Sequence, residues 1–210
     1  MFITFEGVDG SGKTTQAAQT VSFLRDCGYD VLAVREPGGT PTGDRIRQIL
    51  LDDVATADMN PRAELLLFCA SRAQLVAEVI IPHLEAGGVV VSDRYTDSTM
   101  AYQGYGHGLN LKALKQVNDF ATAGLRPDMT LFLDIEPEEG LARRIAAGED
   151  AGWNRLDAMA LDFHRRVYRG YRNLVLAEPA RFVEIDARAD EATVQERVRA
   201  ALAEWLEIQR

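Results

Sequence analysis

The chain is poor in cysteine, in positive charge and in long apolar runs, and each shortage excludes a class of protein. Its 210 residues include two cysteines, Cys27 and Cys69, each within an expected helix beside apolar residues, which favours buried thiols over a disulfide or a metal pair. Lysine and arginine number 23 against 32 acidic residues, giving a net charge of −9, so a general nucleic-acid binder is disfavoured. No apolar run approaches about 18 residues, which argues against a membrane span.

What is present fits one globular domain, 1–210. The length allows a sizeable core, and the hydrophobic fraction of 47% is ordinary for such a protein. The sequence contains no repeat, low-complexity stretch or linker. No secretory signal fits before the glycine-rich stretch that begins at residue 7, so we expect a cytoplasmic protein.

Short apolar runs alternate with helical periodicity, which predicts an α/β fold with a parallel sheet. The expected strands are Phe2–Phe5, Asp30–Val34, Val89–Ser92, Met129–Asp134 and Arg181–Ile185. The expected helices are Lys13–Cys27, Thr42–Leu51, Pro61–Glu85 with a kink near Pro82, Leu111–Ala123, Pro137–Ala147, Leu156–Ala177 and a terminal helix. A short helical piece near Ser98–Tyr102 precedes an expected loop with Gly104, Gly106 and Gly108.

Residues Gly7–Thr14, with the sequence GVDGSGKT, match the pattern G-x-x-x-x-G-K-[ST] between an expected strand and an expected helix. Glycines let the backbone approach phosphate oxygens closely, and the helix N-terminus adds its dipole. Lys13 can reach the β- and γ-phosphates, and Thr14 can offer its hydroxyl to Mg²⁺. A chance glycine turn is the alternative. The pattern predicts a triphosphate site formed by Gly7, Val8, Asp9, Gly10, Ser11, Gly12, Lys13 and Thr14.

The strand Val89–Ser92 ends in Asp93 and Arg94. In a protein with such a phosphate loop, an acid at this place commonly holds Mg²⁺, although a strand-end cap is the alternative for Asp93. Many ATPases have a glutamate next, where it activates water. Arg94 stands there instead and would stabilise phosphate charge, which favours phosphoryl transfer to a second phosphate-bearing substrate over hydrolysis.

Longer stretches resemble bacterial thymidylate kinases, a family of P-loop nucleoside monophosphate kinases. They are FEGVDGSGKTTQ (5–16), REPGGTPTG (35–43), LLLFCASRAQL (65–75), DRYTDSTMAYQGYGHG (93–108), and NRLD and DFHRRV downstream. They occur in the family's order over most of the chain, and REPGGT with DRY…S-x-x-AYQG is more specific than the phosphate loop alone. The resemblance implies a P-loop NTPase-type three-layer sandwich with a five-stranded parallel sheet. It also implies a homodimer that, with ATP and Mg²⁺, converts dTMP to dTDP for dTTP synthesis.

The resemblance also implies roles for single positions at the phosphate end of the site. Asp9 matches an acid near the acceptor and the phosphate chemistry, and Glu36 matches a residue near dTMP. Arg47 is expected to hold the acceptor phosphate, together with Arg94. The alternatives are a solvated loop acid for Asp9 and an exposed helical cation for Arg47.

At the nucleoside end, Phe68 and Arg72 are four residues apart and share one helix face. The resemblance implies that the Phe68 ring packs on thymine and that Arg72 bonds its carbonyl edge. Tyr102 matches an aromatic residue against the sugar, where a 2′-hydroxyl would be, and the residues expected along the base are Ser98, Thr99 and Gln103. Plain packing is the alternative for Phe68 and Tyr102.

One departure concerns the catalytic arginine. Some family members carry an arginine inside the phosphate loop, where this chain has Gly10. The expected substitute is an arginine beside a mobile lid at about 148–155, a glycine-bounded stretch whose own side chains are acidic or apolar. We rank Arg143 first and Arg155 second, with Arg144 as a salt-bridging neighbour; a surface cation is the alternative for each.

Two rival functions stay open at this point. Another nucleoside monophosphate kinase differs from this interpretation only in the residues expected to contact the base. A GTP-dependent switch would normally show an N-K-x-D element late in the chain, and the sequence has none.

Overall fold

Five parallel strands form one sheet, in the order β2-β3-β1-β4-β5, in the computed structural model, which describes residues 1–51, 58–146, 156 and 159–208. The strands are β1 (Phe2–Glu6), β2 (Val31–Arg35), β3 (Val89–Asp93), β4 (Met129–Asp134) and β5 (Phe182–Asp186). The central strands are buried along nearly their whole length, which explains their continuous apolar runs. The predicted parallel sheet is confirmed, and the end of each strand lies within one residue of the expected position.

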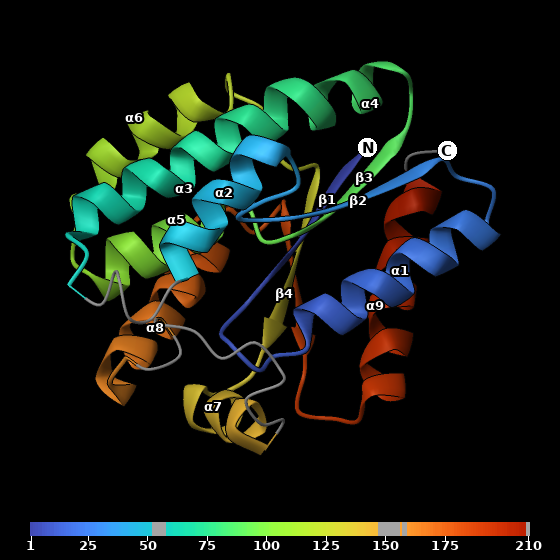
Figure 1. Cartoon of the computed structure of the whole chain (residues 1–210). Helices are drawn as coiled ribbons and strands as arrows, with labels where there is room; N and C mark the ends of the chain where they lie inside the picture. Colours follow the sequence, from blue (N-terminus) through green and yellow to red (C-terminus); the bar gives the residue numbers. More distant parts are fainter. Residues whose placement is uncertain (52–57, 147–155, 157–158, 209–210) are drawn as a thin grey trace.

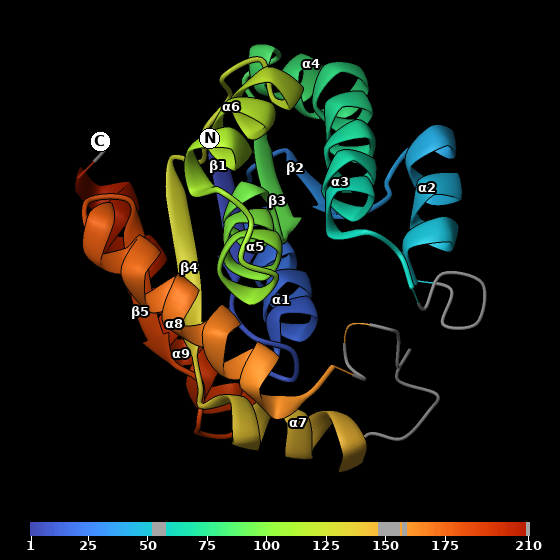
Figure 2. The same ribbon diagram turned by 90° about the vertical axis from the view of Figure 1, so that its left-hand side faces the viewer.

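Helices cover both faces of this sheet and make three layers (Figures 1 and 2). On one face α1 (Lys13–Asp26) packs against α9 (Glu191–Ile208). The other helices with α geometry are α2 (Pro41–Leu51), α3 (Pro61–Leu75), α4 (Ile81–Glu85), α5 (Thr96–Thr99), α6 (Leu111–Ala121), α7 (Pro137–Ala146) and α8 (Leu161–Ala177). Two π-helical segments, η1 (Val76–Ile80) and η2 (Met100–Gly106), follow α3 and α5 directly.

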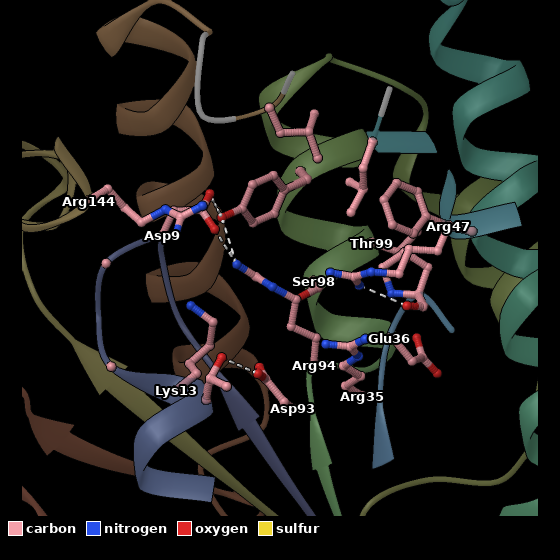
Figure 3. Close-up of a pocket in the computed structure, with 18 of the residues that line it drawn as sticks. Asp9, Lys13, Arg35, Glu36, Arg47, Asp93, Arg94, Ser98, Thr99 and Arg144 are labelled. Carbon is pink, nitrogen blue, oxygen red and sulfur yellow. Dashed lines mark hydrogen bonds and ion pairs between the residues drawn. The ribbon is translucent and has the colours of Figure 1, made fainter. Parts of the chain in front are cut away.

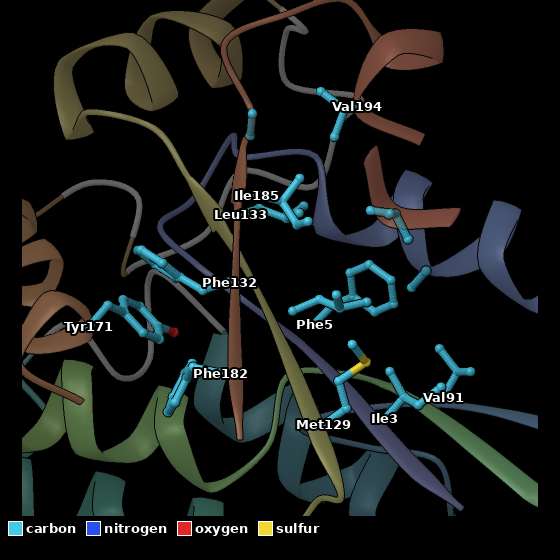
Figure 4. Close-up of a cluster of buried hydrophobic side chains, with 14 of the residues drawn as sticks. Ile3, Phe5, Val91, Met129, Phe132, Leu133, Tyr171, Phe182, Ile185 and Val194 are labelled. Carbon is cyan, nitrogen blue, oxygen red and sulfur yellow. The ribbon is translucent and has the colours of Figure 1, made fainter. Parts of the chain in front are cut away.

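Strand β4 shows how consecutive residues supply the two halves of the core. Phe132 points to one face, where its ring stacks on Tyr171 of α8 with 5.5 Å between ring centroids. Leu133 points to the other face, toward Ile185 and Val194, as Figure 4 shows. This alternation follows from the pleat of the strand and joins the two helical layers through the sheet.

The long helix expected at Pro61–Glu85 forms as α3, η1 and α4 in succession, and Pro82 is accommodated by the wide π turn before it. The Ile81 N–H bonds the Val76 carbonyl, five residues back, so the ladder changes spacing just where Pro82 supplies no N–H. Among the described residues this helix has the length and mean hydropathy, 1.6, that a membrane span needs. Its Leu75, Val76 and Ile80 are in fact core residues under the sheet, so its apolar composition has a packing cause.

The helical piece expected near Ser98–Tyr102 is present, but it continues as η2 to Gly106, where the sequence predicted a glycine-rich loop. Gly104 and Gly106 lie inside η2, and a Cβ on Gly106 would lie 2.7 Å from the Phe163 ring of α8. A Cβ on Gly170 of α8 would likewise lie 2.7 Å from the Tyr105 ring. These glycines therefore serve close packing between η2 and α8 and not chain flexibility.

Two smaller expectations are also corrected. Helix α8 begins at Leu161 and not at Leu156, which is a buried core residue before the helix. Cys27 is exposed, because α1 ends at Asp26 and the chain turns away at Gly28, whose φ is 90°. Cys69 is buried as expected. The predicted lid at 148–155 lies outside the described residues.

Candidate active site

A cavity of about 620 Å³ opens beyond the carboxyl ends of β1, β2 and β3, where the segments after these strands converge. Figure 3 shows Lys13 and Arg144 toward one end of this pocket, Glu36 and Arg47 toward the other, and Arg94 between them. The residues predicted from the sequence that line it are Asp9, Gly10, Gly12, Lys13, Thr14, Glu36, Arg47, Phe68, Arg72, Asp93, Arg94, Ser98, Thr99, Tyr102, Gln103 and Arg143.

The remaining predicted residues fall elsewhere. Gly7, Val8 and Ser11 belong to the phosphate loop without lining the cavity, and Arg155 lies outside the described residues. Sequence reasoning gave no ligand role to several residues that do line it, namely Thr15, Arg35, Pro37, Leu51, Arg144 and Leu156.

The loop between β1 and α1 folds as its glycine pattern predicts. Gly7, Gly10 and Gly12 have φ angles of 147°, 78° and 90°, which residues with a Cβ seldom adopt. Helix α1 begins directly after Gly12, so its N-terminus and positive dipole end lie at the pocket. The geometry suits an anionic ligand at this end.

Gly10 lies against α7, with no room for a side chain. A Cβ on Gly10 would lie 1.9 Å from the Gly140 carbonyl oxygen, and a Cβ on Gly140 would lie 2.4 Å from the Asp9 carbonyl oxygen. This contact between two backbones excludes an arginine at position 10. It also brings α7, with Arg143 and Arg144, alongside the phosphate loop.

The Lys13 ammonium group is buried at the base of the loop, where its Nζ donates to the Val8 carbonyl at 2.7 Å and to Ser11 Oγ at 3.2 Å. Burial and the nearby Arg94 charge lower the pKa of Lys13 to about 8, although Asp9 and other carboxylates oppose the shift. An anion bound here would favour the charged form of the lysine further and raise this pKa.

Thr14 and Asp93, the two predicted Mg²⁺ ligands, are in contact: Thr14 Oγ1 donates to Asp93 Oδ2 at 2.6 Å. Within the described residues no cluster of three or more histidine, cysteine or acidic side chains could hold a metal by itself. A hydroxyl and a carboxylate are hard oxygen donors of the kind Mg²⁺ prefers, and this ion commonly takes its other ligands from phosphate and water. The donor set therefore fits the predicted ion.

Arg94 combines a constrained backbone with an enclosed side chain. Its φ of 75° lies in the left-handed region, where strain of this kind is frequent at functional sites. Its Nη2 forms an ion pair with Asp9, and its guanidinium carbon lies 5.1 Å from the centre of the Tyr102 ring. Burial opposes its charge, but Tyr102 and Asp9 outweigh that effect and raise the pKa of Arg94, which stays a cation.

Asp9 completes this pair. Burial alone would raise the pKa of its carboxyl, but the Arg94 and Lys13 charges hold it below the usual value. Its Oδ2 also accepts a hydrogen bond from Tyr102 Oη at 2.6 Å. Asp9 therefore stands as a carboxylate between the cation of the phosphate loop and the cation after β3.

The Arg72 guanidinium is fully buried and makes four hydrogen bonds to the protein besides its ion pair with Glu36. Nε and Nη2 bond Glu36 Oε2 at 2.7 and 2.6 Å, Nη1 donates to Thr99 Oγ1 at 3.0 Å and to Asn118 Oδ1 at 2.7 Å, and Nη2 donates to the Tyr95 carbonyl at 3.1 Å. Arg72 therefore links four segments of the chain, counting its own helix. The sequence did not indicate this structural role. A ligand contact by this arginine would have to share one of these hydrogens.

Arg47 and Arg35 form the far end of the pocket. Arg47 Nη1 donates to the Pro37 carbonyl at 2.9 Å, and burial and the like charge of Arg35 lower the pKa of Arg47. Arg35 ends β2, in register with Asp93 of β3. Sequence reasoning gave Arg35 no role, although its place at the end of a strand, at the shared edge of a parallel sheet, could have indicated a site residue. Two cations this close favour an anion between them.

The wall beside the pocket comes from α3, α5 and η2. Phe68 and Arg72 share one face of α3, as their spacing predicted, and both line the cavity. Gln103 Nε2 donates to the buried Glu64 carboxylate at 2.7 Å, which turns the amide oxygen away from Glu64. Ser98 also lines the cavity, and its hydroxyl donates to Glu6 and accepts from Arg94.

Arg143 and Arg144, the two described arginines that precede the predicted lid, differ in their surroundings. Arg143 donates to the Ala187 carbonyl at 2.8 Å, to the Arg188 carbonyl at 2.9 Å and to Glu139 at 2.7 Å, so it joins α7 to the segment after β5. Arg144 lines the same cavity, at the end that also holds Lys13 (Figure 3). The ranking of Arg143 as first donor is therefore not supported by its contacts.

Comparisons with known proteins agree with this geometry. The family model "Thymidylate kinase" matches residues 5–198. A thymidylate kinase from Roseiflexus sp. (strain RS-1) is 48% identical over 98% of this chain and 95% of its own length. One from Synechococcus sp. (strain JA-2-3B'a(2-13)) is 52% identical over 94% and 92%. The crystal structure of thymidylate kinase from Ehrlichia chaffeensis superposes with a TM-score of 0.79, is 31% identical, and covers 96% of this chain and 98% of that one.

The contact between α7 and the phosphate loop can be tested with Gly140→Ala. Alanine favours a helix by about 1 kcal/mol, but its Cβ would push the Asp9 carbonyl and the phosphate loop away. We expect the ATP dissociation constant, measured by calorimetry, to rise about tenfold with helix content unchanged, because overpacking of this kind costs roughly 1–3 kcal/mol. Glu138→Ala, at an exposed position of the same helix, is the control. Equal ATP affinity and melting temperature in the two variants would contradict the contact.

Proposed function

Because this chain belongs to the thymidylate kinase family, and is therefore a transferase that phosphorylates dTMP with ATP, we propose how its pocket residues divide that work. The observation that carries the division is the layout of charge. A phosphate loop occupies one end of the cavity, Arg35 and Arg47 occupy the other, and the Asp9–Arg94 pair stands between them. Two phosphate-bearing substrates would meet at that pair.

The phosphate loop and the N-terminus of α1 hold the ATP phosphates, with Lys13 on the β- and γ-phosphates. Thr14 and Asp93 hold Mg²⁺, which when bound neutralises charge on the phosphate oxygens. The support for this assignment is the conformation of the loop and the 2.6 Å contact between the two proposed ligands. Binding of the polyphosphate replaces the protein contacts of Lys13 with phosphate contacts.

Arg47, Arg35 and Arg94 hold the dTMP phosphate. Their guanidinium groups come from α2, from the end of β2 and from the residue after β3, so they surround one end of the cavity. Arginine suits this task because its planar fork binds phosphate oxygens in pairs. Glu36 acts indirectly, by fixing Arg72.

The nucleoside lies along α3 and η2. Phe68 packs on the thymine ring, with Arg72, Thr99 and Gln103 at its edge. Tyr102 borders the sugar and is held in place by its hydrogen bond to Asp9. A phenol fixed in this way leaves little room for an added hydroxyl, which favours a deoxyribonucleotide.

The transfer itself is catalysed by charge and position. The moving phosphoryl group spreads negative charge over its oxygens, and cations placed beforehand stabilise that charge. Lys13 and Arg94 stand on two sides of the Asp9 carboxylate, which keeps both cations in place. We infer that Arg144, which lines the cavity at the end that also holds Lys13, supplies a further cation from α7, and that Arg143 holds that helix.

Two further properties belong to the proposal. A homodimer is supported by the exposed apolar side chains of Leu66 on α3 and Phe120 on α6, 58% and 89% exposed on helices that pack together. Action in the cytoplasm is supported by the substrates, since ATP and dTMP are nucleotides of that compartment. The net charge of −9 gives no reason to add a nucleic-acid partner.

The acceptor end is tested with Arg47→Ala. Losing a charge-assisted contact with phosphate costs about 1.5–3 kcal/mol, so the dTMP dissociation constant should rise about tenfold to a hundredfold while that of ATP stays unchanged. Arg45→Ala, at an exposed position of the same helix, is the matched control and should bind dTMP as the parent does. If Arg47→Ala keeps the parental dTMP affinity, Arg47 does not hold the acceptor.

The two arginines of α7 are separated by single-turnover kinetics. Arg144→Ala should slow phosphoryl transfer by at least about tenfold with near-parental dissociation constants for both substrates, because a cation on the moving phosphate acts mainly in the transition state. Arg143→Ala should instead lower the melting temperature, with a smaller loss in rate. The reverse pattern would restore Arg143 as the donor.

A further inference from the structure

Glu6, the last residue of β1, has a fully buried carboxyl group for which the reaction described above has no use. It lies one residue before the phosphate loop and does not line the cavity. Its Oε1 accepts the backbone N–H groups of Tyr95 at 2.8 Å and Ser98 at 3.2 Å. Its Oε2 accepts the hydroxyls of Ser98 at 2.6 Å and Tyr171 at 2.8 Å.

These four partners fix the direction of every hydrogen bond. A backbone N–H can only donate, so Oε1 must be an acceptor for Tyr95 and Ser98. An ionised carboxylate carries no hydrogen, so the Ser98 and Tyr171 hydroxyls must both point their hydrogens at Oε2. With Glu6 in place, these two hydroxyls have only lone pairs to offer to any other neighbour.

That neighbour is Arg94. Its Nη1 lies 3.0 Å from Ser98 Oγ and 3.4 Å from Tyr171 Oη, and it reaches the Gly7 carbonyl at 3.3 Å. Both hydroxyls can accept from the guanidinium because Glu6 has taken their hydrogens. The Nη2 side of the same group is held by Asp9 and Tyr102. Through the Ser98 and Tyr171 hydroxyls, Glu6 thus determines which acceptors face Nη1 of Arg94.

We propose that Glu6 is a positioning residue for phosphoryl transfer: by turning the Ser98 and Tyr171 hydroxyls into acceptors, it holds the Arg94 guanidinium in the orientation in which it meets the acceptor phosphate. The inference rests on the role proposed above for Arg94. It assigns to Tyr171, a core residue of α8, and to Ser98 a part in the same support.

Glu6→Gln is the sharpest substitution, because it changes hydrogen-bond direction with little change of shape. The two backbone N–H groups cannot reverse, so the amide oxygen must face them and the amide nitrogen must face the hydroxyls. Ser98 and Tyr171 would then accept from the amide, and their hydrogens would be free to turn toward each other or toward Arg94. The arginine would lose at least one of its two hydroxyl acceptors, and a hydroxyl hydrogen would face it instead.

The measurement is steady-state kinetics at pH 8, above the pKa of about 7 to which burial and the Asp97 charge raise the Glu6 carboxyl. We expect kcat/KM for dTMP to fall at least about tenfold in Glu6→Gln, with KM for ATP within about twofold of the parent. The control is Asp97→Asn, a buried acid on the neighbouring helix α5 that pairs with Arg181 at 2.7 Å. It should lower the melting temperature without this change in kcat/KM.

A double-mutant cycle with Arg94→Ala decides whether Glu6 acts through Arg94. The inference predicts that Glu6→Gln changes kcat/KM by less than about twofold once Arg94 is absent. If Arg94→Ala is strongly impaired and Glu6→Gln adds its full effect, the inference is overturned while the proposed function stands. If Arg94→Ala keeps parental kcat/KM, the role of Arg94 fails and the inference fails with it.

Tyr171→Phe gives the same test without altering the buried acid, should Glu6→Gln not fold. It removes one of the two oriented acceptors and leaves the other on Ser98. We expect a smaller fall in kcat/KM for dTMP, about threefold, that disappears in the Arg94→Ala background. A loss that persists in that background would overturn the inference.

Discussion

The site depends on arginines that specific carboxylates hold in place, in a protein whose net charge is −9. Glu36 holds the buried Arg72, and Asp9 holds the half-buried Arg94. A buried charge without a partner costs several kcal/mol, so removing Glu36 would leave in Arg72 a cation that the fold could not keep there. The pairs therefore fix the guanidinium groups before a nucleotide arrives. Such prior placement is the main means by which proteins catalyse phosphoryl transfer.

Close packing at glycines brings together the elements that surround the cavity. Gly10 against Gly140 brings α7 to the phosphate loop, and Gly106 and Gly170 let η2 lie on α8. The π turn of η2 carries Tyr102 and Gln103 into the cavity wall. π-Helical segments are frequent at functional sites because they re-aim side chains at a cost in regularity. Sheet, loop and wall thus meet around a single cavity.

The sequence predicted the sheet and the phosphate loop well, because both depend on local signals such as apolar runs and glycines at set spacing. It failed at η2, since Gly104 and Gly106 indicate flexibility until it is known that α6 packs on Gly104 and that α8, about 60 residues later, packs on Gly106. It passed over Glu6 for a similar reason. A single acid at a strand end carries no pattern, and its partners come from the segment between β3 and α5, from α5 and from α8. Long-range packing decides such cases.

The central claim is that this cavity joins an ATP phosphate loop to an acceptor site shaped for dTMP. It is tested most directly by one coupled assay of ATP consumption with dTMP, dUMP, dCMP, dAMP, dGMP and UMP as acceptors. The account predicts that dTMP has the highest kcat/KM, about tenfold or more above dUMP, which lacks one methyl group, and far above the others. Another monophosphate that matches or exceeds dTMP would contradict it.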